Sequence, residues 1–290
     1  MAQTQAIKRR IRSVQNAGQI TKALEVVAAS RMRRIQDSVA KVRHYGELAD
    51  SIMRRIAPSQ EAAQHPYFKN FNGKSVLYVV FSSDRGQAGA FNSNVFSQAH
   101  KSFMRDRTSG LKPVVIVFGR KGASHFAHIA GIELAGAYQD IADTPDVNVF
   151  SPVLETIANG AANGDFASVQ IIYTQFVSSL THTVQQFQLL PIALEKADKP
   201  EENTKVYEFE PGIEAVLDEA LRIYFEARFM AARVESAASE NAMRMIAMGN
   251  AHRNASDLVD NLTLELNSAR QAAITQEIAE ITGGAEAIRV

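Results

Sequence analysis

The stretch AASRMRRIQDSVAKVRHYGELADSIMRRI, residues 28–56, decides the fold, because its apolar and small residues recur at spacings that alternate between four and three. A repeat that averages 3.5 residues keeps one stripe of a helix facing a partner helix, which is typical of a coiled coil. The predicted stripe consists of Ala28, Met32, Ile35, Val39, Val42, Gly46, Ala49, Met53 and Ile56.

The C-terminal part of the chain carries the same repeat in two runs separated by a phase shift, which is read as a stutter. All eight prolines lie between Pro58 and Pro211. Because a proline inside a helix costs about 3 kcal/mol, the proline-free ends allow two very long helices. The two C-terminal runs are Val216, Ala220, Ile223, Ala227, Met230 and Val234, followed by Ala255, Val259, Leu262, Leu266, Ala269 and Ala273.

The middle of the chain alternates apolar, β-branched runs with helical stretches, which indicates a largely parallel sheet. Strands are expected at 75–84, 113–119, 168–178 and 183–192, the last two as a hairpin, with helices at 94–106, 121–130 and 147–163. The predicted fold class is therefore α/β, with a long antiparallel coiled coil of the terminal helices and an inserted Rossmann-like domain. The expected boundaries are 1–57 for the N-terminal helix, 58–211 for the α/β domain and 212–290 for the C-terminal helix.

Charge and composition exclude several classes of protein. Formal net charge is zero, so nothing in the total charge favours nucleic acid or an anionic membrane. Residues 1–57 carry a net charge of +8 and residues 212–290 a net charge of −5, so the two ends either attract each other or present two solvated faces. There is no cysteine, which excludes a disulfide framework and a thiolate catalyst. No apolar run approaches the roughly 18–20 residues that span a bilayer.

Residues typical of catalysis are scattered. The loop SDRGQAGAFN, residues 83–92, follows the first strand, where a dinucleotide or phosphate loop would lie. Its Gly86 and Gly89 form neither the dinucleotide pattern nor a P-loop, so a tight strand-to-helix turn is the better interpretation. His125 and His128 are three residues apart on one helix, but no acidic neighbour completes a ligand set. We expect no catalytic residue, no metal site and no cofactor.

Two polar surfaces on the terminal helices are candidate partner-binding sites. Lys22, Arg31, Arg33 and Arg34 surround a helix of small residues and form either a solvated face or a collar for an acidic partner. The tip NSARQAAITQEIAEI, residues 267–281, carries short or planar hydrogen-bonding side chains where a solvated face would carry lysine and glutamate. These side chains are Arg270, Gln271, Thr275 and Gln276.

Three of these stretches resemble a known family. IRSVQNAGQITKALEVVAASRMRRIQ (11–36) and ARQAAITQEIAEI (269–281) are similar to the two terminal helices of the gamma subunit of F-type ATP synthases. The loop SSDRGQAGAFNSN (82–94) is similar to that family's mid-chain loop, although Gln87 and Ala88 depart from its usual sequence. The resemblance extends over effectively the whole chain.

The resemblance implies a non-catalytic rotor of a proton-translocating ATP synthase. It would transmit torque between the c-subunit ring in the membrane and the ring of alpha and beta subunits, where ADP and phosphate become ATP. The implied location is peripheral, on the cytoplasmic face of a bacterial inner membrane, which this chain would contact only through the complex.

The resemblance also implies roles for individual residues. Arg270 and Gln271, with Thr275 and Gln276 one turn further on, would contact catch loops of beta. Lys22, Arg31, Arg33 and Arg34 would face acidic loops of beta. Tyr207, Phe209 and Glu210 would contact the epsilon subunit and the c ring. The alternative that remains open from the residues alone is a coiled-coil adaptor with an α/β recognition domain.

Overall fold

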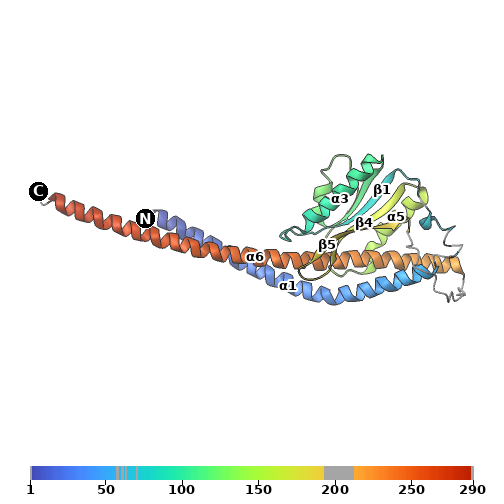
Figure 1. Cartoon of the computed structure of the whole chain (residues 1–290), viewed down its shortest axis with the longest axis horizontal. Helices are drawn as coiled ribbons and strands as arrows, with labels where there is room; N and C mark the ends of the chain where they lie inside the picture. Colours follow the sequence, from blue (N-terminus) through green and yellow to red (C-terminus); the bar gives the residue numbers. More distant parts are fainter. Residues whose placement is uncertain are drawn as a thin grey trace. The chain divides into compact units, whose positions relative to one another are not determined.

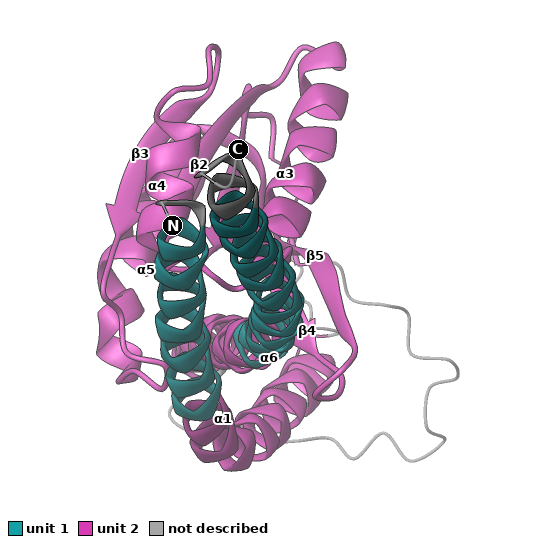
Figure 2. Cartoon of the chain, turned by 90° about the vertical axis from the view of Figure 1, so that its left-hand side faces the viewer, with its two compact units in different colours: residues 1–28, 244–290 teal, residues 29–243 magenta. Residues whose placement is uncertain are grey.

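The computed structural model describes residues 2–56, 59, 62, 64–69, 71–192 and 212–288 of the 290-residue chain. The chain divides into two compact units, which are coloured separately in Figure 2. The first combines residues 1–28 with residues 244–290, and the second consists of residues 29–243. Each unit therefore contains part of both terminal helices.

Figure 1 shows the helices and strands in chain order. They are α1 (Ala2–Ile56), η1 (Pro66–Phe68), β1 (Ser75–Phe81), α3 (Phe91–Thr108), β2 (Lys112–Phe118), α4 (Arg120–Phe126), β3 (Glu133–Tyr138), η2 (Val147–Phe150), α5 (Ser151–Asn163), β4 (Phe166–Phe176), β5 (His182–Leu190) and α6 (Ile213–Ile288). The predicted class, with two long terminal helices around a mixed α/β domain, is confirmed.

Helix α1 buries one continuous stripe. All nine residues of the predicted stripe are buried or half-buried. The same spacing continues toward the N-terminus through residues that the sequence did not single out, because several of them are polar or small. These additional buried or half-buried positions are Thr4, Ile7, Ile11, Val14, Gly18, Thr21 and Glu25.

In the first unit, α1 and α6 lie side by side and antiparallel (Figure 2). The Nδ1 atom of His252 lies 3.0 Å from the carbonyl oxygen of Gly18, and Glu25 lies against Gly249. A Cβ atom placed on Gly18 would come within 3.3 Å of the Cβ of Ala255. Small residues therefore let the two helices approach closely, as the alanine-rich repeat predicts.

The second unit contains a five-stranded sheet with the order β3-β2-β1-β4-β5. Strands β3, β2, β1 and β4 are parallel, and β4 pairs with β5 as the predicted antiparallel hairpin. Strand β3 was not predicted. Its sequence ELAGAY contains small residues and is only half-buried on alternate positions, as suits an edge strand, so it lacks the apolar run that marks the others. The helix expected at 121–130 ends at Phe126.

Alternate residues of each central strand point to opposite faces of the sheet. On one face, Leu77, Val79 and Phe81 of β1 pack in a core with residues of α1, α5 and α6. On the other face, Tyr78 and Val80 pack with residues of α3 and α4. The terminal helices of this unit are therefore fixed to the sheet through one large apolar core.

An aromatic cluster joins α6 to this core. The rings of Phe81 and Phe118, on neighbouring strands, are stacked with their centroids 4.7 Å apart. The ring of Phe229 from α6 lies 6.3 Å from Phe81, 6.5 Å from Phe118 and 5.5 Å from Phe150. Offset and edge-to-face aromatic pairs of this kind add stabilisation beyond the area that they bury.

Helix α6 is buried on every side between residues 232 and 242. The carboxylate of Glu235 accepts hydrogen bonds from Nε of Arg43 on α1 at 3.0 Å and from the backbone N–H of Phe176 on β4 at 3.1 Å. Arg43 also donates to the carbonyl oxygen of Phe176 at 2.5 Å. We call Arg43, Glu235 and the backbone of Phe176 the α1–α6–β4 cluster, since it ties these three elements together.

Candidate functional site

The four polar residues predicted at the tip are all exposed on α6. Thr275 donates to the carbonyl oxygen of Gln271 at 3.0 Å, and Gln276 donates to Glu280 at 2.9 Å. Among the described residues, neither the guanidinium group of Arg270 nor the side-chain amide of Gln271 has a hydrogen-bond partner. These two side chains are therefore available to an external partner.

Exposed apolar side chains lie on the same part of α6, at the helical spacing of four and three. They are Ile274, Ile278 and Ile281. These three isoleucines are not among the site residues that the sequence predicts. The tip thus offers hydrogen-bonding groups and an apolar strip on one slender helix.

The predicted basic residues of α1 are distributed over both units. Lys22 belongs to the first unit, is exposed, and forms an ion pair with Glu25 at 3.1 Å. In the second unit, Arg33 and Arg34 are exposed and Arg31 is half-buried. The role of these four residues as a collar stays a prediction.

Three residues proposed from the resemblance, Tyr207, Phe209 and Glu210, lie outside the described residues. Their contacts with epsilon and the c ring stay a prediction.

The loop after β1 is held by its own side chains. Asn92 accepts a hydrogen bond from the backbone N–H of Ser83 at 3.0 Å and donates to the Ser83 hydroxyl at 2.7 Å. The Ser83 carbonyl in turn accepts from the backbone N–H of Lys121. A backbone N–H that a phosphate would use at this edge of the sheet is thus already bonded, which agrees with a tight turn.

A pocket of about 730 Å³ opens beside this loop, between the start of α3 and α4. Its lining combines acidic, basic and imidazole groups: Asp84, Gly86, Asn92, Phe96, Arg120, Lys121, Ser124, His125 and His128. Arg120 is held by Asp140 at 2.7 Å and by Gln139 at 3.3 Å.

Two histidines meet beside this pocket, and one of them, His125, lines it. The Nε2 atoms of His100 on α3 and His125 on α4 lie 3.0 Å apart. Burial lowers the pKa of His125, and the neighbouring His100 lowers it further. The sequence suggested only the pair His125 and His128, but His128 instead contacts the Ser124 carbonyl oxygen through Nδ1 at 2.8 Å. The actual partner, 25 residues away, had no sequence signal.

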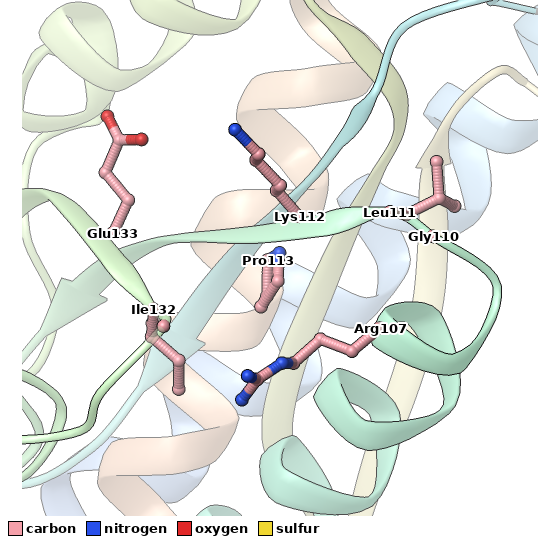
Figure 3. A pocket seen from close by; sticks show the side chains of 8 residues that line it. Arg107, Gly110, Leu111, Lys112, Pro113, Ile132 and Glu133 are labelled. Carbon is pink, nitrogen blue, oxygen red and sulfur yellow. The ribbon is translucent and has the colours of Figure 1, made fainter.

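Figure 3 shows a second pocket, of about 470 Å³, at the N-terminal ends of β2 and β3. The guanidinium group of Arg107 lies on one side of β2, while the ammonium group of Lys112 and the carboxylate of Glu133 point away from it. These charges do not converge on one point, so the pocket does not form a recognisable ligand site. In the part of the chain that the structure describes, no three metal-ligating side chains of the histidine, cysteine, aspartate and glutamate types come together.

No helix among the described residues has the length and apolar character needed to cross a membrane.

His182 on β5 predicts a pH dependence of folding. Burial lowers the pKa of His182 from 6.5, and the nearby backbone of Ser179 opposes this effect. The unfolded chain therefore binds more protons between the lowered pKa and about pH 6.5. The contribution of neutral, buried His182 to folding stability is fully present above about pH 6.5, and it is lost as the pH falls through the folded-state pKa.

We expect His182→Gln to flatten the fall in denaturation midpoint between pH 7 and pH 5, measured by urea unfolding. The control is His44→Gln, at an exposed position on α1, which should retain the wild-type profile. An unchanged slope in His182→Gln would contradict this assignment.

The structure defines a class of protein with two long terminal helices that pair antiparallel within each unit. A Rossmann-like domain lies between the helices in the sequence, and exposed polar residues lie near the end of the longer helix.

Comparison with known proteins identifies the family. A family model described as ATP synthase matches residues 3–288. The chain is 35% identical over 288 residues to the ATP synthase gamma chain of Desulforamulus reducens, which covers 99% of this chain and all of that one. It is 38% identical over 291 residues to that of Chloroflexus aurantiacus, with 99% of each covered. The chain belongs to the ATP synthase gamma chain family.

Solved structures support the fold. The rotor of the Euglena gracilis mitochondrial ATP synthase is 17% identical and matches with a TM-score of 0.69, covering 94% of this chain and 99% of that one. The central stalk and c ring structure of the Tetrahymena thermophila enzyme contains a chain that is 22% identical, with a TM-score of 0.62 and 80% of this chain covered.

Proposed function

We propose that this chain is the central rotor of an ATP synthase, transmitting torque between an ion-driven c ring and a ring of alpha and beta subunits. Family membership supports the proposal, and one observation carries it to the residue level. Arg270 and Gln271 of the tip are exposed and have no partner among the described residues. A shaft that must engage successive partners needs such groups free, because contacts that break at each step have to form again on a different subunit.

The division of labour follows from the helices and the sheet. We propose that segments 1–57 and 212–290 form the shaft, and that segment 58–211 forms a foot against the epsilon subunit and the c ring. A shaft transmits torque only if its two helices are fixed to the foot. The shared core of α1, α6 and the sheet, together with the α1–α6–β4 cluster, supports this requirement.

The proposed subunit is itself non-catalytic and needs no cofactor, because the chemistry of ATP formation would belong to alpha and beta. Its proposed place is peripheral, at the cytoplasmic face of a bacterial inner membrane, where it contacts the membrane only through the complex.

The direct test is to tag the chain in its own cell, solubilise the membranes gently and identify the proteins that copurify. We expect alpha and beta subunits in molar excess over this chain, with ATP hydrolysis in the eluate. A different partner, or none, would overturn the proposal and leave the adaptor interpretation.

The tip residues have a separate test. We expect Arg270→Ala with Gln271→Ala to lower coupled ATP synthesis in membrane vesicles about tenfold or more, since a hydrogen bond that involves a charged group contributes about 1.5–3 kcal/mol. The isolated chain should keep its wild-type unfolding midpoint, because both side chains are exposed.

The matched control for the tip is Arg270→Lys with Gln271→Asn, which preserves the charge and the amide and should restore part of the synthesis rate. Wild-type synthesis in the double alanine variant would refute the role assigned to these two residues, while leaving the copurification result intact.

A further inference from the structure

Two imidazole rings from different helices face each other at the edge of the pocket beside α4. The Nε2 atom of His100 lies 3.0 Å from the Nε2 atom of His125, and the two ring planes are inclined by 80° with their centroids 5.2 Å apart. A zinc–nitrogen bond is about 2.0–2.1 Å long. Two nitrogen ligands on one metal at angles between a right angle and a tetrahedral angle are therefore about 2.9–3.4 Å apart.

We propose that His100 and His125 form a two-histidine site for a transition-metal ion such as Zn²⁺ or Cu²⁺, linking α3 to α4. The two Nε2 atoms share a hydrogen bond, and their separation matches the span that a single ion requires, so a bound ion would replace the proton between the rings. This inference is independent of the rotor proposal, since it concerns only the side chains of the α/β domain.

The surrounding aromatic rings hold both imidazoles in place. His125 is stacked on Phe96, with the centroids 4.2 Å apart and the planes within 6°. His100 packs edge-on against Phe103 at 6.1 Å, and both histidines contact Phe126. Because the rings are already ordered, little side-chain entropy is lost when a metal ion binds.

The space and the ligand types at the pocket determine which ions can bind. His125 lines a space of about 730 Å³, which leaves room for water molecules at the remaining coordination positions. Imidazole nitrogen suits zinc, copper and nickel, whereas magnesium and calcium prefer oxygen ligands. Arg120 and Lys121 line the same pocket. Their positive charge opposes a cation that is bound only by electrostatic attraction. It also favours an anion as an additional ligand of the metal.

The test is a titration of the untagged full-length chain with Zn²⁺, in which binding and the unfolding temperature are both measured by calorimetry. We expect one ion bound per chain, and a rise in unfolding temperature with zinc concentration, because an ion that binds only the folded state stabilises it. Mg²⁺ at the same concentrations should leave the unfolding temperature unchanged.

Three single variants locate the site. His100→Gln and His125→Gln should each weaken zinc binding at least about tenfold and remove the zinc-dependent rise in unfolding temperature. His128→Gln, three residues further along from His125 and lining the same pocket, should bind zinc like the wild type. The unfolding temperature of each variant without metal shows that it is folded.

Wild-type zinc affinity in a folded His100→Gln variant would overturn the proposal, as would an equal loss in His128→Gln. X-ray absorption of the zinc-loaded chain gives an independent measurement, in which two imidazole ligands are expected. A spectrum that shows one imidazole or none would also refute the site.

Discussion

Replacing Phe229 by alanine is expected to lower the free energy of unfolding by about 3–5 kcal/mol. The Phe229 side chain is completely buried, and its ring lies against the rings of Phe81, Phe118 and Phe150. Truncation removes the transfer free energy of the ring and leaves a cavity whose walls belong to two strands and η2. Since these walls belong to different elements of the core, we expect them to relax only partly toward the space.

The measurement is urea unfolding of the full-length chain, followed by circular dichroism. Met104→Ala is a suitable control, since Met104 is a large apolar residue on α3 that is 72% exposed. Its substitution should change the unfolding free energy by less than about 0.5 kcal/mol. Equal effects at the two positions would show that α6 is not anchored to the sheet by this aromatic cluster.

Replacing Glu235 by alanine is expected to cost about 2–4 kcal/mol of folding free energy. The Glu235 side chain is 5% exposed and accepts hydrogen bonds from Arg43 and from the backbone of Phe176. Its removal leaves the N–H of Phe176 buried without this acceptor and leaves Arg43 without its ion-pair partner. The Arg43 side chain is 42% exposed, so solvent screens part of its charge and the cost stays below that of a fully buried pair.

A double-mutant cycle of Arg43→Ala and Glu235→Ala separates the pair from the backbone contact. We expect an interaction energy of about 1–3 kcal/mol between the two positions. Glu47→Ala on α1 is the control, because Glu47 faces an exposed His44 and should unfold like the wild type. Additive effects of the two single variants would mean that Arg43 and Glu235 do not act as one unit.

The helices were the most predictable part of this protein. The repeat of apolar residues in 28–56 identified the buried stripe of α1 correctly, because a coiled-coil seam imposes its period on every turn. The edge strand β3 escaped prediction, since a strand that is covered incompletely does not need an apolar run. The part of the stripe before Ala28 was not predicted, because at Gly18 close approach of the helices replaces a bulky apolar side chain.

The candidate sites were predictable to different degrees. Exposure of Arg270 and Gln271 followed from their polarity on a long helix, but the partners proposed for them rest on resemblance to a family. The α1–α6–β4 cluster could not be predicted, because Arg43 and Glu235 are 192 residues apart. A buried carboxylate on a helix has no local signature in the sequence; only the fold shows which cation and which backbone N–H surround it.

The pairing of Arg43 with Glu235 also has a consequence for folding while the chain is being synthesised. At a synthesis rate of about 5–20 residues per second, the 192 residues that separate them take about 10–40 s to add. During that interval the residues of α1 that pack against α6 have not yet met their partner helix. Long-range contacts of this kind close late and slowly, so the face of α1 that pairs with α6 stays exposed until the C-terminal helix has been synthesised.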